Sequence, residues 1–215
     1  MHRYLRAAKR KRKNSLREVL NAILKVACCG LQWRSLDDKY PPWQSVFYYF
    51  RKWQKDGTFL SVLRRLREKI RRQLGREAEA SAVAVDSQSV KKGPLVGQET
   101  GIDGGKNVNG RKRHLAVDTL GLPLVVNVTA ANVNDGKAGI EMLWQLEAES
   151  KRLKLIRADQ AYEGDFQAAT TYYQWTVEIA PKARIPARVR PPKRSLAGRT
   201  SLRMAQLFPP PGKGL

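Results

Sequence analysis

Apolar side chains recur every three or four residues along the first third of the sequence, which is the spacing of an amphipathic helix. The pattern predicts three helices, over residues 15–30, 41–57 and 58–75. Ser15 and Glu18 have capping-box spacing. Three such helices make a small domain of helix-turn-helix size. The residues expected to face inward are Leu16, Val19, Leu20, Ile23, Leu24 and Ala27, then Val46, Phe47, Phe50 and Trp53, then Leu60, Leu63, Leu66, Ile70 and Leu74.

From residue 80 the pattern changes to short apolar runs rich in valine and isoleucine, which is typical of buried strands. We therefore expect an α/β domain behind the small all-helical one. The stretch "SAVAVDSQSV" predicts a strand whose apolar run ends at Asp86, and a glycine-rich mobile loop over 93–112 and a hairpin over 114–128 follow it. Next comes a helix from Asn134, with Ile140, Leu143, Trp144 and Leu146 facing inward. The last predicted elements are a strand ending at Asp159, a helix over 163–175 and a strand "TVEIAP".

Two aspartates stand at the predicted carboxyl ends of strands. Ligands of α/β sheets bind at that edge, so Asp86 and Asp159 are expected to lie side by side. Paired carboxylates with no softer donor nearby suit Mg²⁺ or Mn²⁺. Taken singly, each aspartate is as well explained as a turn or capping residue. That structural role is the one we assign to Asp118, Asp135 and Asp165.

The net charge of the chain indicates which kind of molecule it binds. The chain has 41 Lys and Arg against 19 Asp and Glu, a net charge of +22, which favours a polyanion such as DNA over an anionic membrane surface. No apolar run approaches the roughly 18 residues that span a bilayer, so we expect a soluble intracellular protein. The adjacent Cys28 and Cys29, with only His2 and His114, make neither an ordinary disulfide nor a zinc site.

Basic residues gather in two places in the N-terminal part. The first is an arm over residues 1–14, and the second is the outer face of the third predicted helix. We expect that helix to face phosphates through Arg64, Arg65, Arg67, Lys69, Arg71 and Arg72. The neighbouring aromatic residues, Trp43, Phe47, Tyr48, Tyr49, Phe50 and Trp53, suit a core better than a platform for stacking bases.

The stretches "REVLNAILKVACCGLQWRSLDDKYPPWQSVFYYFRKWQKDGTF", "VDSQSVK", "GIDGGKNVNGRKRHLAVDTLGLPLVVNVTAANVNDG" and "IRADQAYEGD" resemble bacterial insertion-sequence transposases of the DDE type, in the group named for insertion sequence five. The resemblance implies an RNase H-like catalytic core behind a helical DNA-binding domain. It also implies a reaction on element ends and target DNA with Mg²⁺ or Mn²⁺, a homo-oligomer on DNA, and a place at the bacterial nucleoid in the cytoplasm.

Two members of the family's acidic triad match this sequence. They are Asp86 and Asp159, which the resemblance makes metal-binding catalytic residues. The glycine-rich basic segment corresponds to a family motif, and from it we expect DNA contacts by Lys106, Arg111, Lys112 and Arg113.

The third acid of the family, a glutamate on a helix in a run resembling R-W-V-V-E-R-T-F-A-W-L, is missing. Codons chosen for Ser195 to Pro211 read one base later as R-W-R-V-E-R-R-F-A-W-L, with the glutamate spanning the codons of Arg199 and Thr200. A frame change near Lys193 or Arg194 is therefore our hypothesis. The expected organisation is a basic arm at 1–14, a helical DNA-binding domain at 15–78, an incomplete DDE core at 80–190 and an out-of-frame tail at 191–215.

Three functions follow from these observations. The leading one is a transposase that lacks one metal ligand and is impaired. A non-catalytic DNA-binding protein, or a regulator of intact transposase, is the alternative from another class. A metal-dependent nuclease that does not transpose uses the same residues. If the next frame is closed, Glu178 or Glu163 remains to be tested as the third ligand.

Overall fold

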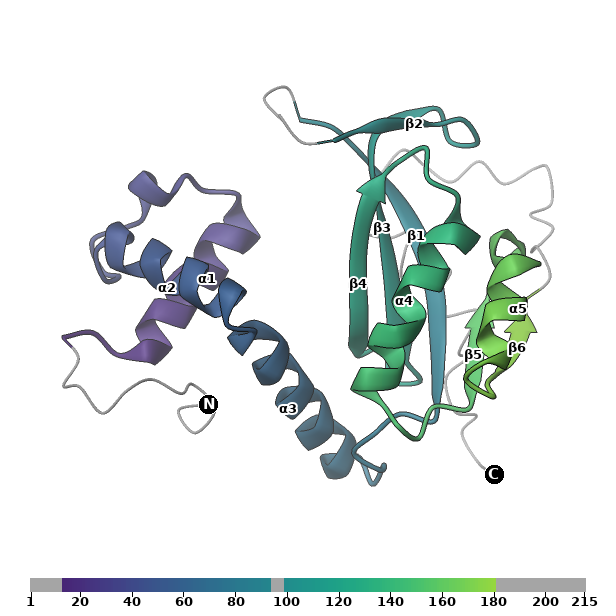
Figure 1. Cartoon of the computed structure of the whole chain (residues 1–215). Coiled ribbons are helices and arrows are strands. Elements are labelled where there is room, and N and C mark those ends of the chain that lie inside the picture. Colours follow the sequence, from purple (N-terminus) through teal and green to yellow (C-terminus); the bar gives the residue numbers. More distant parts are fainter. Residues whose placement is uncertain (1–12, 94–98, 181–215) are drawn as a thin grey trace, which may run out of the picture. The chain divides into compact units, whose positions relative to one another are not determined.

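A computed structural model describes residues 13–93 and 99–180, which form parts of two compact units, Met1–Ile70 and Arg71–Leu215 (Figure 1). The tail hypothesis for 191–215 and most of the predicted basic arm fall outside the described residues. No helix among those described is both long and apolar enough to cross a lipid bilayer.

The first unit is helical, as its sequence period predicts. It contains α1 (Leu16–Cys29), a short 3₁₀ helix η2 (Trp33–Ser35), α2 (Trp43–Lys55) and most of α3 (Thr58–Gln73). Ser15 caps α1 by accepting a hydrogen bond from the Arg17 amide at 3.2 Å. Gly30 ends this helix at a φ of 63°, a backbone conformation that favours glycine. Both ends of α1 are thus fixed by residues visible in the sequence.

The core of this unit lies between α1, α2 and the first half of α3. Its buried residues are Leu16, Val19, Leu20, Ala22, Ile23, Val46, Trp53 and Val62, with Trp33, Phe50, Phe59 and Leu66 among those packed around them. Aromatic pairs add directional contacts, such as Trp53 against Phe59 with ring centroids 5.8 Å apart.

The prediction for the apolar face of α3 is wrong at four of its five positions, because Leu60, Leu63, Ile70 and Leu74 are exposed and only Leu66 packs against the core. The buried residues of this helix include Val62, Arg67 and Arg71 instead. The apolar residues of an amphipathic helix cover a wide part of its surface, and their spacing alone does not determine which of them contact the neighbouring helices.

The second unit is an α/β structure built on a six-stranded sheet in the order β2-β3-β1-β5-β6, with β4 also pairing with β3. Strand β1 is antiparallel to β3 and parallel to β5, and β5 is parallel to β6. The elements are β1 (Ala82–Lys91), β2 (Gly101–Asp103), β3 (Val108–Asp118), β4 (Pro123–Ala130), α4 (Asp135–Glu149), β5 (Leu155–Ala158), the 3₁₀ helix η3 (Gln160–Tyr162), α5 (Asp165–Thr171) and β6 (Thr176–Ile179).

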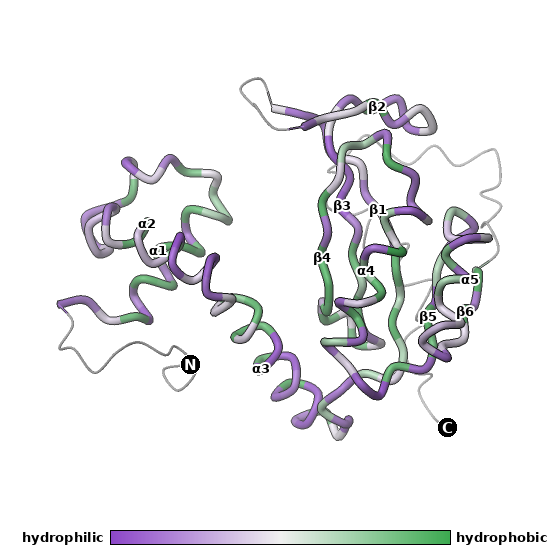
Figure 2. The backbone as a smooth tube through the Cα atoms, in the orientation of Figure 1, coloured by the Kyte–Doolittle hydropathy of each residue, from purple (hydrophilic) through white to green (hydrophobic). Residues whose placement is uncertain are grey.

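Two expectations about strands need correction. Strand β1 does not end at Asp86 but continues to Lys91, and its sequence changes from mostly hydrophobic to mostly hydrophilic on the way (Figure 2). The predicted loop at 93–112 contains β2 and the start of β3, while 94–98 lies outside the described residues. Glycine here allows strands to approach closely, since a Cβ at Gly110 would lie 2.0 Å from the Val90 carbonyl oxygen.

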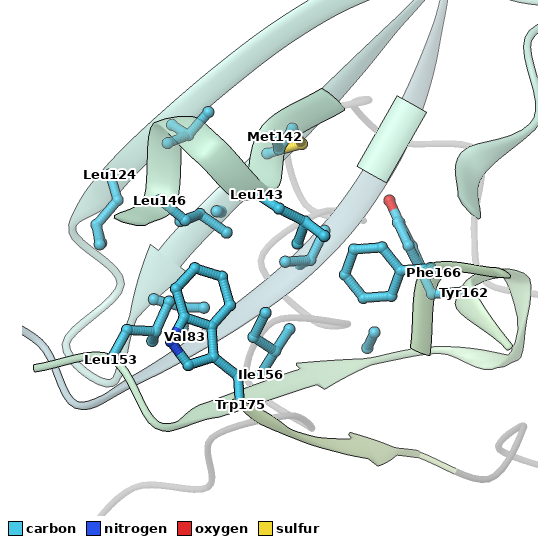
Figure 3. Close-up of a cluster of buried hydrophobic side chains, with 14 of the residues drawn as sticks. Val83, Leu124, Met142, Leu143, Leu146, Leu153, Ile156, Tyr162, Phe166 and Trp175 are labelled. Carbon is cyan, nitrogen blue, oxygen red and sulfur yellow. The ribbon is translucent and has the colours of Figure 1, made fainter. Parts of the chain in front are cut away.

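Helices α4 and α5 cover the same face of the sheet (Figure 1). They pack on Val83 and Val85 of β1 and on Ile156 and Ala158 of β5 (Figure 3). Trp144 was expected in this core but is exposed, and the helix predicted over 163–175 is the shorter α5, with the separate η3 before it. The buried members of α4, α5 and η3 include Met142, Leu143, Leu146, Tyr162 and Phe166.

An ion pair connects the last turn of α3 to the turn between β3 and β4. Arg71 Nη1 lies 2.5 Å from Asp118 Oδ2, and both side chains are almost fully buried. Asp118 Oδ1 also accepts hydrogen bonds from the amides of Leu120 and Leu122. The expectation that Arg71 faces DNA is therefore wrong, while Asp118 has the structural role expected of it.

We expect Arg71→Met to lower the free energy of unfolding by about 3 to 5 kcal/mol, because Asp118 would stay buried without its countercharge. The exposed neighbour Arg72 supplies the matched control, Arg72→Met, with a change within about 0.5 kcal/mol. Urea unfolding followed by circular dichroism measures both values. Equal losses in the two variants would contradict this account of the ion pair.

Candidate functional site

Asp86 lies on β1, and Asp159 directly follows β5, the strand that runs parallel to β1. The register pairs Ala84 with Arg157, and two residues further along each chain come Asp86 and Asp159. Adjacent strands are about 4.8 Å apart, so continuing this register puts the two backbone positions side by side. Asp159 follows the end of β5 as expected, whereas Asp86 lies in the middle of β1.

Side-chain alternation gives both aspartates the same face of the sheet. Val83 and Val85 pack under α4 and α5, so Asp86 belongs to the opposite face. Ile156 and Ala158 alternate in the same way on β5, and Asp159 continues the extended backbone with a φ of -87° and a ψ of 176°. The two carboxylates therefore share one side of the sheet.

Each carboxylate is oriented by a backbone amide. Asp86 is 7% exposed, and its Oδ1 accepts a hydrogen bond from the Ser87 amide at 2.7 Å. Asp159 caps η3 by accepting from the Ala161 amide at 3.0 Å. Two hard oxygen donors held in this way suit Mg²⁺, which proteins often bind through one or two carboxylates together with water and substrate phosphates.

The described residues contain no group of three or more His, Cys, Asp or Glu side chains that could hold a metal ion. Glu178 lies on β6 opposite Arg157, and its Oε2 is 2.8 Å from Arg157 Nε. Glu163 is exposed after η3. Neither glutamate completes a three-residue site with Asp86 and Asp159.

A buried polar group lies on the α4 side of β3. Lys112 Nζ is 2.9 Å from Asp135 Oδ1 in an ion pair, and it donates a hydrogen bond to the Val133 carbonyl at 2.8 Å. Lys112 is only 6% exposed, so the expectation that it contacts DNA is wrong. Asp135 begins α4, as expected of a structural residue.

His114 belongs to the same buried group. It is fully buried, with Nε2 at 2.9 Å from Thr129 Oγ1 and Nδ1 at 4.0 Å from Asp135 Oδ1. Burial lowers the pKa of His114 below its usual value, and the nearby Asp135 opposes this only in part. The ring is therefore neutral at pH 7. Lys112 and His114 share one face of a strand because they are two residues apart, a signal that the sequence carried.

Tyr162 is a buried residue that sequence reasoning missed. Its hydroxyl makes no hydrogen bond of good geometry among the described residues, although the Ser87 side chain lies close enough to lower its pKa. Burial raises the pKa of Tyr162, and the carboxylates of Asp135, Asp86 and Asp159 raise it further. The phenol is consequently neutral beside three acids. Its position three residues after Asp159, in a single turn of helix, is the only signal the sequence offers.

The other basic candidates lie near the free end of the β1–β3 pair. Lys106 is in the turn between β2 and β3, where Asp103 accepts hydrogen bonds from the amides of Gly105 and Lys106. Arg113 is exposed and donates to Gln88 Oε1 at 2.7 Å, while Arg111 is half-buried. Lys106 and Arg113, unlike Lys112, are accessible to a ligand in solvent.

We expect the stability of the protein to fall as the pH drops from 7 toward 5. Below about pH 6.5 the unfolded chain binds a proton at His114 that the folded chain resists binding, because its folded pKa is lowered. Thermal unfolding at pH 7 and 5.5 should show a smaller decrease of Tm in His114→Gln than in the unchanged protein. An equal decrease in both would contradict the assigned protonation state.

Two protein families match the chain. Residues 1–63 match a family described as a putative transposase of the IS4/5 family, and residues 77–190 match the transposase DDE domain. The second match alone covers more than half of the 215 residues. No curated protein is significantly similar to the chain.

Solved structures give remote similarities. The Mos1 transposase paired-end complex with left transposon end is 11% identical with a TM-score of 0.32, over 80% of this chain and 61% of that chain. The piggyBac transposase synaptic complex with hairpin DNA is 14% identical with a TM-score of 0.29, over 53% of this chain and 27% of that one. The chain thus spans about three fifths of the length of Mos1, and these TM-scores are too low to define a shared fold.

Proposed function

Because the chain belongs to the DDE transposases of the IS4/5 type, we propose that it binds DNA and that Asp86 and Asp159 hold a divalent metal ion for DNA cleavage and strand transfer. The observation that carries this proposal is the register of β1 and β5, which pairs Ala84 with Arg157, each two residues before one of the aspartates. The DNA would be the ends of a bacterial insertion sequence and its target, bound by a homo-oligomer at the nucleoid.

We further propose that the second unit is an RNase H-like core. Its support is the strand arrangement, in which three antiparallel strands, β4, β3 and β1, are followed by the parallel strands β5 and β6. The first acid then lies in the middle of the central strand and the second follows the neighbouring parallel strand.

The residues of the site have separate roles in this proposal. Asp86 and Asp159 bind Mg²⁺ or Mn²⁺, and the amides of Ser87 and Ala161 keep the two carboxylates oriented. A bound ion supplies a more acidic water and stabilises the charge that develops on phosphate oxygens. Burial of Asp86 limits access of bulk water, which strengthens its electrostatic interactions.

The chain as written would have impaired activity. The described residues supply two carboxylates and no third metal-binding partner. Residues that act as a unit lose most of their activity when one is removed. The second candidate is a folded DNA-binding protein that regulates intact transposase. The absence of a third carboxylate among the described residues favours it, because such a protein needs no catalysis.

We expect Mg²⁺ or Mn²⁺ to stabilise the protein through both aspartates. A metal concentration ten times the Kd adds about 1.4 kcal/mol, or roughly 3 to 6 °C in Tm. Asp86→Asn and Asp159→Asn should each abolish this shift, whereas Asp165→Asn, which changes an exposed aspartate on α5, should keep it. A shift that survives in both site variants would exclude this metal site.

Correcting the reading frame after Lys193, so that R-W-R-V-E-R-R-F-A-W-L follows, should restore activity. We expect metal-dependent cutting of plasmid DNA to rise roughly 100-fold or more over the chain as written. The corrected chain with that glutamate changed to glutamine is the control. Joined strands would identify a transposase and nicks alone a nuclease, while equal activity of all three chains would refute the frame hypothesis.

A further inference from the structure

Helix α2 has one exposed polar face and one buried apolar face. Val46 and Trp53 are fully buried in the core of the helical unit. On the opposite side lie four exposed residues at intervals of four, three and four, which is the spacing of a single helical stripe. We call this stripe, with the adjacent exposed Lys52, the outer face of α2; it consists of Gln44, Tyr48, Arg51, Lys52 and Lys55.

The outer face is positively charged, and Lys52 is close enough to Asp56 for the two charges to attract each other. Helix α2 contains no Asp or Glu. Among the described residues, no carboxylate forms an ion pair with Arg51, Lys52 or Lys55. The acid that follows the helix, Asp56, accepts hydrogen bonds from the Thr58 amide and hydroxyl at the start of α3.

Tyr48 adds an aromatic ring to this charged surface. Its side chain is 59% exposed, and its only ring contact in the described structure is with Tyr49, at 5.3 Å between centroids. Among the other aromatic residues of α2, Trp53 is buried and Tyr49 and Phe50 pack against the core as predicted, whereas Phe47 was expected inside and is exposed.

The arginines of α3 are much less available. Arg67 and Arg71 are buried. Arg64, Arg65 and Arg72 interact with other groups of the chain. Apart from the exposed Lys69, the members of the basic row that the sequence singled out are thus buried or interact within the chain, whereas Arg51, Lys52 and Lys55 form no ion pair among the described residues.

We propose that the outer face of α2 is the surface through which the helical unit binds duplex DNA. This inference rests on the proposed DNA-binding function and assigns the contact to α2 in place of the α3 arginines. Gln44 to Lys55 spans about 16 Å of helix, and the major groove, about 12 Å wide, admits a helix. Arg51, Lys52 and Lys55 neutralise phosphates, while Gln44, in the first turn, reaches base edges.

Fluorescence anisotropy of the full chain with a labelled 30-base-pair duplex of mixed sequence, over a series of salt concentrations, tests the proposal. The α2 double variant is Arg51→Ala with Lys55→Ala, and the matched α3 variant is Arg64→Ala with Arg72→Ala. Losing two phosphate contacts should weaken binding about tenfold or more and reduce the salt slope by about 2. The α3 variant should stay within about twofold of the unchanged chain.

The outcomes separate this inference from the function it rests on. No binding of the duplex by the unchanged chain would refute both. Binding that is reduced in the α3 variant but not in the α2 variant would refute the α2 surface and leave DNA binding intact. Tyr48→Ala should also weaken binding, and unchanged circular dichroism of each variant shows that the loss is not unfolding. A stronger effect of the α2 changes on single-stranded than on duplex DNA would overturn the assignment to a groove.

Discussion

The pairing of β1 on both of its edges is the constraint on which the candidate site depends. Its antiparallel register with β3 and parallel register with β5 fix the position of Asp86 in two directions at once. A slip by one residue would exchange the two faces of the strand, turning Asp86 toward the helices and turning the valines that now pack there away from them. The hydrophobic core and the placement of the acid are therefore set by the same register.

Helix α4 is held against this sheet by complementary means. At Gly139 a Cβ would lie 2.9 Å from ring carbons of both Tyr162 and Phe166, so the absent side chain makes room for two aromatic rings. At the start of the helix, Asp135 is paired with Lys112 of β3. Close packing in the middle and a buried ion pair at the end give the helix one position, and Tyr162 is brought beside the acids as a result.

The sequence predicted the elements with a strong period, and the structure contains them: α1, α2, the strand before Asp159 and the last strand. The expected nearness of Asp86 and Asp159 stays a prediction, and its first reason does not hold for Asp86, which lies in the middle of β1 and not at its carboxyl end. What the sequence could not reveal is which charges are buried. Arg71 and Lys112 find their partners 47 and 23 residues away, and a local pattern contains no information on such pairs. The strands within residues 99–112 were missed because glycine weakens the strand signal.

The ion pair between Arg71 and Asp118 also determines which residues a fragment needs in order to fold as the sheet unit. The DDE domain match starts at residue 77, and a fragment cut there would keep the buried carboxylate but lose its cation. It would also lose the side chain that donates to the carbonyls of Glu77 and Glu79, the first residues of such a fragment. A sheet unit that folds by itself thus requires the last turn of α3, which the family match leaves out. The folding unit begins one helical turn and a short connection before the sequence family does.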